Sequence, residues 1–163
     1  NIIKDLNTPK EVLDKWLIAN SSHVIDLAFY LIGKPKDESF HTYTSGSLSW
    51  HKSACIFNGC GISENNIPFT YFADWAAPGR WALEILTKNN RYILKPMEKL
   101  KTIKRDTVKV DEIPLDDQMD NKYKPGLFYQ VKSFLNYDKT YLCTLQDQIK
   151  AFHIYFKIAG YSD

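Results

Sequence analysis

The sequence is poor in several features that would place it in a specialised class of protein. Its three cysteines, Cys55, Cys60 and Cys143, cannot all pair with one another, and three are ordinary for reduced intracellular thiols. The balance of 21 Lys and Arg against 19 Asp and Glu leaves a formal charge of +2, without the clustered basic face that nucleic-acid binding requires. The longest strongly apolar run, Val24 to Gly33, contains Asp26 and is about half the length of a membrane span. We therefore expect neither a nucleic-acid partner nor a membrane partner.

No signal peptide or transit segment is recognisable, so we expect a cytoplasmic protein. The chain opens with Asn1 in place of methionine, which suggests a fragment or a processed chain. Its 163 residues, of which 44% are hydrophobic and 14% aromatic, suffice to bury a core and argue against disorder. Residues 1–163 are therefore predicted to form a single domain.

The common catalytic signatures are also missing. The sequence has no G-x-G-x-x-G dinucleotide motif, no G-x-x-x-x-G-K-[ST] phosphate loop and no G-x-S-x-G nucleophile elbow. Cys55 and Cys60 lack a second Cys or His pair at zinc spacing, so no metal site is expected.

Helical patterns open the chain. Thr8-Pro9-Lys10-Glu11 predicts a capping box, followed by apolar residues at helical spacing up to Leu17. The polar residues 20–22 predict an interruption in which a serine caps a second helix. That helix, His23 to Ile32, is apolar nearly all round and is expected to be buried, with Gly33 ending it.

Extended patterns follow, and the chain then returns to helix. Seven short extended segments, separated by turns, predict a mostly antiparallel sheet over residues 39–113, and the last two are laced with lysine, as edge strands tend to be. Apolar stripes predict helices at Leu127–Leu135 and from Leu145, where Thr144 and Asp147 resemble a second capping box. The predicted fold is α+β, an open, mostly antiparallel sheet with helices packed on one face.

His23 is the leading candidate for acid–base chemistry. In the first turn of a buried helix, the positive end of the helix dipole would favour a neutral imidazole that accepts a proton. Asp26, three residues further on, could orient it. The alternative is a structural histidine that is hydrogen-bonded to a neighbouring carbonyl or to Asp26, and this alternative is favoured by the spacing alone.

Three other features have simpler interpretations. Trp50-His51 is typical of a sugar site but is better explained as an ordinary loop pair. The basic residues between Lys95 and Lys109 are interleaved with acids, which indicates a solvated sheet edge. Large aromatic residues on both faces of the strand Pro68–Trp75 indicate that one face is core and that another subunit or domain covers the other.

Several segments together resemble the C-terminal domain of the glucose–fructose oxidoreductase/inositol dehydrogenase (Gfo/Idh/MocA) family. The first, Ser22–Gly33, is similar to the family's helix G/S-x-H-x-I-D-L-x-x-x-L-x-G. The others resemble segments of its sheet and late helices: Pro78–Trp81 with Ile85–Thr87, Lys124–Val131, and Cys143–Leu145. The resemblance covers nearly the whole chain.

The resemblance implies a two-domain, NAD- or NADP-dependent enzyme that acts on a sugar, inositol or sugar nucleotide. The cofactor would be bound mainly by an N-terminal Rossmann domain that is absent from this chain. This chain would supply substrate contacts and a sheet face for a homo-oligomer. By resemblance, His23 exchanges the hydroxyl proton of a small polyol or sugar substrate, and Asn20 and Ser22 bind that substrate. The family commonly has an aspartate four residues before the histidine, where this chain has Ala19.

Two alternatives remain open at this stage. One is a non-catalytic carbohydrate-binding or dimerisation module. It would share the fold and would have lost catalysis together with the family's aspartate, which is Ala19 here. An enzyme that uses its cofactor transiently, for epimerisation or glycoside cleavage, would share the histidine.

Overall fold

A computed structural model describes residues 7–140 and 142–161. The chain divides into two compact units: the first contains residues 1–79 and 150–163, and the second contains residues 80–149. Each unit is described by itself below. The single domain expected over residues 1–163 stays a prediction.

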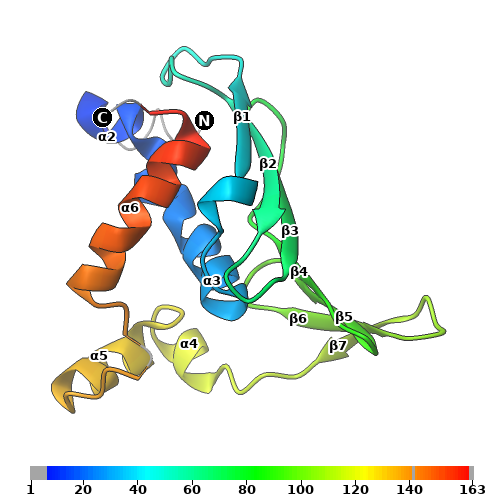
Figure 1. Ribbon diagram of the computed structural model, residues 1–163. Helices are drawn as coiled ribbons and strands as arrows, with labels where there is room; N and C mark the ends of the chain where they lie inside the picture. The colour runs from blue at the N-terminus through cyan, green and yellow to red at the C-terminus, as the bar shows by residue number, and fades with distance from the viewer. Residues whose placement is uncertain (1–6, 141, 162–163) are drawn as a thin grey trace. The chain divides into compact units, whose positions relative to one another are not determined.

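From residue 7 onward, the described part of the first unit starts with three consecutive helical segments (Figure 1). They are α2 (Lys10–Asp14), the π-helical turn η1 (Leu17–Ser21) and α3 (Ser22–Ile32). The predicted capping box at Thr8 does not form, because Pro9 is the N-cap of α2 and no side chain caps it. Gly33 ends α3 with a φ of 85°, a left-handed angle that glycine adopts without strain, so the predicted helix end is confirmed.

A three-stranded antiparallel sheet follows in the first unit. It consists of β1 (His41–Ser45), β2 (Ile56–Ile62) and β3 (Pro68–Asp74), in the order β1-β2-β3. Two glycines of β2 stand opposite aromatic residues of β3, since Gly59 pairs with Tyr71 and Gly61 pairs with Phe69. The aromatic rings lie over these glycines, where a Cβ atom would collide with them.

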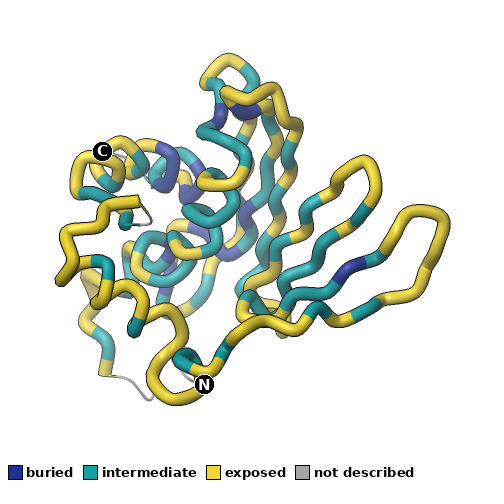
Figure 2. The backbone as a smooth tube through the Cα atoms, turned by 90° about the horizontal axis from the view of Figure 1, so that it is seen from below, coloured by how far each residue is buried: buried dark blue, intermediate teal, exposed yellow. Residues whose placement is uncertain are grey.

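Helices cover one face of this sheet. Helix α6 (Leu145–Ala159) contributes Ile154, Tyr155 and Ile158 to the core, where they are 1–3% exposed. The core also includes Phe57 of β2 and Leu17 of η1. Figure 1 shows α3 and α6 on the same side of β1–β3, and most of the buried segments in Figure 2 belong to this unit.

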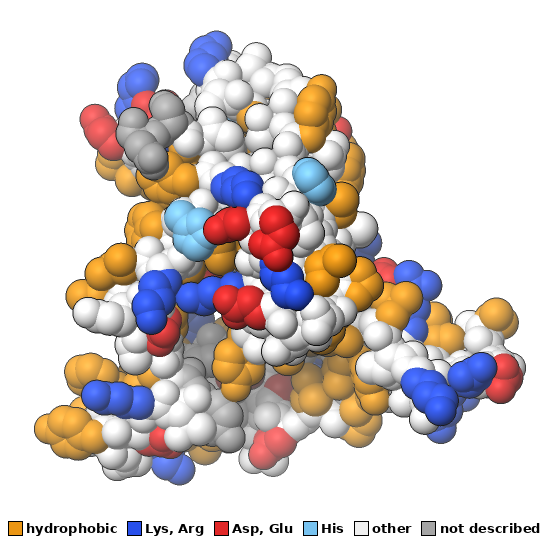
Figure 3. Space-filling model, in the orientation of Figure 1, with side chains coloured by type: hydrophobic (Ala, Val, Ile, Leu, Met, Phe, Trp, Pro, Cys, Tyr) orange, Lys and Arg blue, Asp and Glu red, His pale blue; other side chains and the backbone are white. Residues whose placement is uncertain are grey.

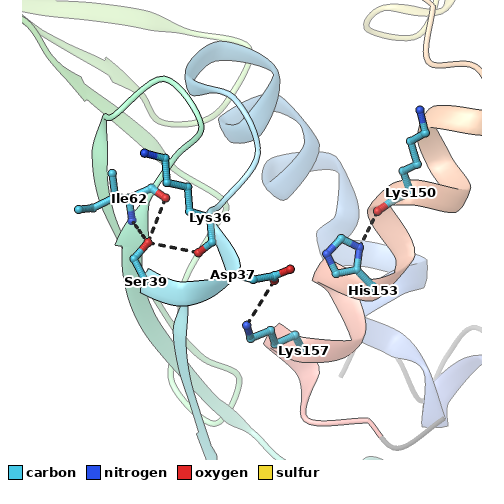
Figure 4. A network of polar contacts seen from close by, with 7 residues as sticks. All are labelled: Lys36, Asp37, Ser39, Ile62, Lys150, His153 and Lys157. Atoms are coloured by element: carbon cyan, nitrogen blue, oxygen red, sulfur yellow. Dashed lines mark hydrogen bonds and ion pairs between the residues drawn. The ribbon is translucent and has the colours of Figure 1, made fainter.

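A short 3₁₀ turn, η2 (Asp37–Ser39), links this sheet to α6 through side chains. The Ser39 hydroxyl accepts a hydrogen bond from the Ile62 amide at 3.1 Å, which ties η2 to the end of β2. Asp37 forms an ion pair with Lys157 of α6 at 3.6 Å. Figure 4 shows these contacts from close by.

The second unit contains a four-stranded antiparallel sheet and two helices. Its strands are β4 (Leu83–Leu86), β5 (Asn90–Leu94), β6 (Leu100–Lys104) and β7 (Val110–Ile113), in chain order. One row across the sheet is wholly aliphatic: Leu83, Leu94, Leu100 and Ile113. The helices are α4 (Gln118–Lys122) and α5 (Leu127–Leu135), and α5 has the predicted bounds.

The second predicted capping box is confirmed at the start of α6. The Asp147 amide donates to Thr144 Oγ1 at 3.2 Å, and the Thr144 amide donates to an Asp147 carboxylate oxygen at 3.3 Å. This reciprocal pair satisfies two amides at the helix entrance.

The α+β class with open antiparallel sheets is confirmed. The strands form two sheets, although the sequence analysis treated them as one, because β3 and β4 do not pair with each other. Between them lie Pro78, which has no amide proton to donate, and Gly79. The helices that pack on one face are observed in the first unit.

Candidate functional site

The predicted site residues lie where η1 passes into α3. The sequence predicted an interruption here, with a serine capping a new helix, and that prediction is wrong. Ser21 has helical angles and makes no side-chain cap bond, so the backbone stays helical from Trp16 to Ile32. The break in apolar spacing is instead a π turn, which inserts one extra residue into a helix. The positive end of a helix dipole therefore does not lie at His23.

Hydrogen bonds define this π turn. The Ser22 amide donates to the Leu17 carbonyl, five residues earlier, in place of the Ile18 carbonyl four residues earlier. The Ser22 hydroxyl donates to that Ile18 carbonyl at 2.7 Å. Leu17 is 3% exposed, and its amide donates to the Tyr161 hydroxyl at 3.4 Å. The start of the π turn is thus anchored in the core.

His23 is exposed and Asn20 is half-buried. Ala19 and Asn20 belong to the π turn and His23 to the first turn of α3, so all three lie within one short stretch of helix. Ala19 is also exposed, which places a methyl group where the resembling family has a carboxylate. The half-buried Asn20 and the exposed His23 are thus three residues apart in the chain, and Ser22 lies between them with its hydroxyl bonded to the backbone.

Asp26 is held by α6. The buried Tyr155 hydroxyl donates a hydrogen bond to Asp26 Oδ1, and this bond joins α3 to α6 across the core. This contact gives Asp26 a structural role in the packing of the two helices.

His51 is a buried structural histidine. It is 0% exposed, with Nδ1 at 2.6 Å from the Ala54 carbonyl and Nε2 at 2.9 Å from the Tyr161 hydroxyl. A carbonyl oxygen can only accept, so Nδ1 carries the proton in this arrangement. Trp50 stacks on Trp75 with ring centroids 5.7 Å apart, and Trp75 also contacts the imidazole edge-on. These contacts support the interpretation of Trp50-His51 as a loop pair that packs against the core.

Tyr71 was not singled out as a polar group by the sequence analysis. Its hydroxyl is buried and, within the described residues, has no hydrogen-bond partner. Burial raises the pKa of the Tyr71 phenol, and the neighbouring Cys60 adds to the shift. Gly59 is the sequence feature that relates to this burial, because it pairs with Tyr71 and leaves room for the Tyr71 ring to lie across it.

Some of the basic residues in and around the second sheet are paired with acids. Lys99 contacts Asp117 at 3.2 Å and Lys109 contacts Asp111 at 2.6 Å. Hydrogen bonds from these lysines hold the pKa of each aspartate below its usual value. Figure 3 shows that acidic and basic side chains are also interspersed on the face of the molecule that carries η2. This arrangement is typical of a solvated edge.

Other possible sites were compared with this one. Among residues 7–140 and 142–161, no group of three or more His, Cys, Asp and Glu could hold a metal ion. An apolar pocket in the second unit includes none of the predicted site residues, and it is lined by Phe134, Leu135, Tyr137, Lys139 and Leu142. Across the same described residues, every helix is too short or too polar to cross a bilayer.

No family model, curated protein or solved structure matches the chain. The family resemblance therefore rests on the sequence motifs quoted above and stays a prediction.

Proposed function

We propose that this chain is the substrate-binding part of an NAD- or NADP-dependent oxidoreductase that acts on a secondary alcohol of a sugar, inositol or sugar nucleotide. The observation that carries the proposal is the accessible imidazole of His23, which follows the π turn that contains Asn20. Single π turns inside α-helices occur frequently at functional sites. The motif Ser22–Gly33 adds the family resemblance.

His23 acts as the acid–base group in this proposal. Oxidation of a secondary alcohol to a ketone removes the hydroxyl proton and a hydride from the same carbon. The imidazole takes the hydroxyl proton, and in the reverse direction it returns a proton to the ketone oxygen. A histidine suits this step because its protonation changes near neutral pH.

Asn20 and Ser22 bind the substrate in this proposal. The Asn20 amide can donate to and accept from ring hydroxyls, but it cannot act as a carboxylate base. The Ser22 proton is directed to the Ile18 carbonyl, so the Ser22 oxygen is available only as an acceptor. With Ala19 in place of an aspartate, His23 is the one titratable group of this cluster.

The described residues do not fit a dinucleotide cofactor. Every strand pair in both sheets is antiparallel, whereas the doubly wound dinucleotide site requires parallel β-α-β units and a glycine-rich turn. The hydride acceptor, NAD or NADP, is therefore proposed to be held by a separate dinucleotide-binding domain.

A homo-oligomer and a cytoplasmic location complete the proposal. The face of β1–β3 that points away from the helices exposes aromatic residues: Tyr43 is 59% exposed and Phe72 is 72% exposed. Both lie in one row with Asn58, so they form a continuous surface for a second copy of the chain. Cys55 and Cys60 are free thiols, which suits a reducing compartment.

The proposal is tested by a substrate screen. The complete polypeptide that carries these residues is incubated with inositols, aldoses or nucleotide sugars and with NAD⁺ or NADP⁺, and nicotinamide reduction is followed by absorbance. Turnover of one substrate class is the expected result. Sugar binding by calorimetry without any nicotinamide turnover would contradict the oxidoreductase and favour a carbohydrate-binding module. Conversion of the sugar without net reduction would indicate transient use of the cofactor.

A further inference from the structure

We propose that the Ser22 hydroxyl is a positioning group, which holds the π turn of η1 and thereby sets the place of His23. The relevance of this role to catalysis rests on the proposed function. The hydrogen-bond geometry that supports the positioning role is independent of the proposed function.

The π turn changes the carbonyl to which the Ser22 amide donates. In an α-helix the Ser22 amide would donate to Ile18, four residues back. Here it donates to Leu17, five residues back. The Ile18 carbonyl receives the Ser22 hydroxyl instead, at 2.7 Å. One residue thus supplies both bonds: its amide closes the π turn, and its side chain satisfies the carbonyl from which that amide was displaced.

Both ends of this segment are fixed by the core. On the N-terminal side, Leu17 is 3% exposed and its amide contacts the Tyr161 hydroxyl. On the C-terminal side, Asp26 accepts the Tyr155 hydroxyl, and Ile25 packs against the core cluster. An inserted residue rotates the two sides of a helix relative to each other by about 100°. The π turn therefore lets both sides face the core.

His23 is the residue directly after Ser22, and it is exposed. If the Ser22 amide returned to the Ile18 carbonyl, the turn would become α-helical and the backbone that carries Asn20 would rotate relative to α3. The relation between Asn20 and His23 would change with it. The Ser22 hydroxyl favours the π turn because it satisfies the Ile18 carbonyl that the Ser22 amide leaves.

Two substitutions in the full chain test this role. S22A removes the hydroxyl, and S22T retains one that can bond to the carbonyl four residues back in a helix. NMR measures amide exchange of Ser22, or of the residue that replaces it, and the titration midpoint of the His23 imidazole, which is assigned with His23→Gln. The exchange rates are corrected for the intrinsic rate of each residue type.

In S22A we expect position 22 to exchange about fivefold faster, the factor that corresponds to losing a typical hydrogen bond. The His23 midpoint is expected to move in S22A and to stay at the wild-type value in S22T. Unchanged exchange in S22A, equal changes in both variants, or faster exchange with an unmoved His23 midpoint would each overturn the proposal. If S22A does not fold, Ser22→Cys serves in its place, because a thiol of similar shape is a weaker donor.

This experiment is independent of the proposed function, because it needs neither substrate nor cofactor. If the positioning role fails, the two NMR observables stay unmoved or change alike in both variants. If the oxidoreductase fails, the substrate screen shows no nicotinamide turnover, whatever the Ser22 variants do.

Discussion

At the scale of single residues, Gly59 shows how closely β1, β2 and β3 pack. A Cβ atom at this position would lie 2.4 Å from the His41 carbonyl oxygen and 2.6 Å from the Tyr71 ring. Since the nearest atom belongs to the backbone, a rotamer change cannot relieve the collision. We expect Gly59→Ala to lower the free energy of unfolding by about 1–3 kcal/mol, as overpacking does.

Urea denaturation measures this change, and Gly79→Ala is the matched control. A Cβ at Gly79 meets nothing within 4 Å, so its effect should stay within about 0.5 kcal/mol. Equal stabilities for the two variants would show that the sheet yields at Gly59.

The buried Tyr71 hydroxyl makes stability depend on pH in the alkaline range. Burial first, and Cys60 second, raise the pKa of the phenol in the folded state above its ordinary value of about 10. The folded chain thus keeps this proton more tightly than the unfolded chain, so stability is fully present below about pH 10 and falls as the pH rises beyond it.

Tyr71→Phe is expected to reduce this alkaline loss. At neutral pH it should leave stability unchanged or raise it, since it removes a buried hydroxyl that has no hydrogen-bond partner among the described residues. Thermal unfolding at neutral and alkaline pH measures both effects. A large loss of stability at neutral pH would mean that the hydroxyl has a partner after all.

At the scale of elements, the contact between α3 and α6 depends on Tyr155 and Asp26. Tyr155→Phe removes the donor and leaves the Asp26 carboxylate without this bond in a partly buried place. The free energy of unfolding should fall by about 1.5–3 kcal/mol, as for hydrogen bonds to charged groups. Chemical denaturation measures it, with Tyr43→Phe as the control on an exposed tyrosine. Equal stabilities of the wild type and Tyr155→Phe would show that this bond does not stabilise the core.

Much of the element order could be predicted from the sequence. The α5 helix and the Thr144 capping box follow from spacing that local chemistry determines, and both are confirmed. The π turn could not be predicted, because polar residues 20–22 suit a cap as well as a turn. Two distant tyrosines, Tyr155 and Tyr161, bond to the helix on either side of the π turn, and no local sequence pattern reveals these contacts.

The arrangement of the predicted site residues could likewise be predicted from the sequence only in part. The sequence identified His23 by its place in a helix, and Asn20 and Ser22 by the family resemblance; the structure shows that His23 is exposed and Asn20 is half-buried. The direction of the Ser22 hydroxyl depends on which carbonyl the backbone leaves free, which spacing does not reveal. The partner of Asp26 lies 129 residues away in the chain, so no local pattern could indicate it.

At the scale of the whole molecule, the exposed aromatic face of β1–β3 predicts self-association. Phe72→Glu places a charge in the centre of this face, where a second copy would bury it, so the molar mass in solution should fall toward that of one chain. Light scattering after size-exclusion chromatography measures the mass. Val108→Glu, at a side chain that is 94% exposed in the other unit, is expected to keep the wild-type mass. A monomeric wild type would contradict the proposed interface.

The central claim is that His23 exchanges the substrate proton, and steady-state kinetics of His23→Gln in the complete enzyme tests it most directly. The control is His153→Gln, because His153 is also exposed but lies on α6, where its Nδ1 is 2.7 Å from the Lys150 carbonyl (Figure 4). We predict that kcat falls about tenfold or more in His23→Gln and stays at the wild-type value in His153→Gln. Unchanged turnover in His23→Gln would contradict the account.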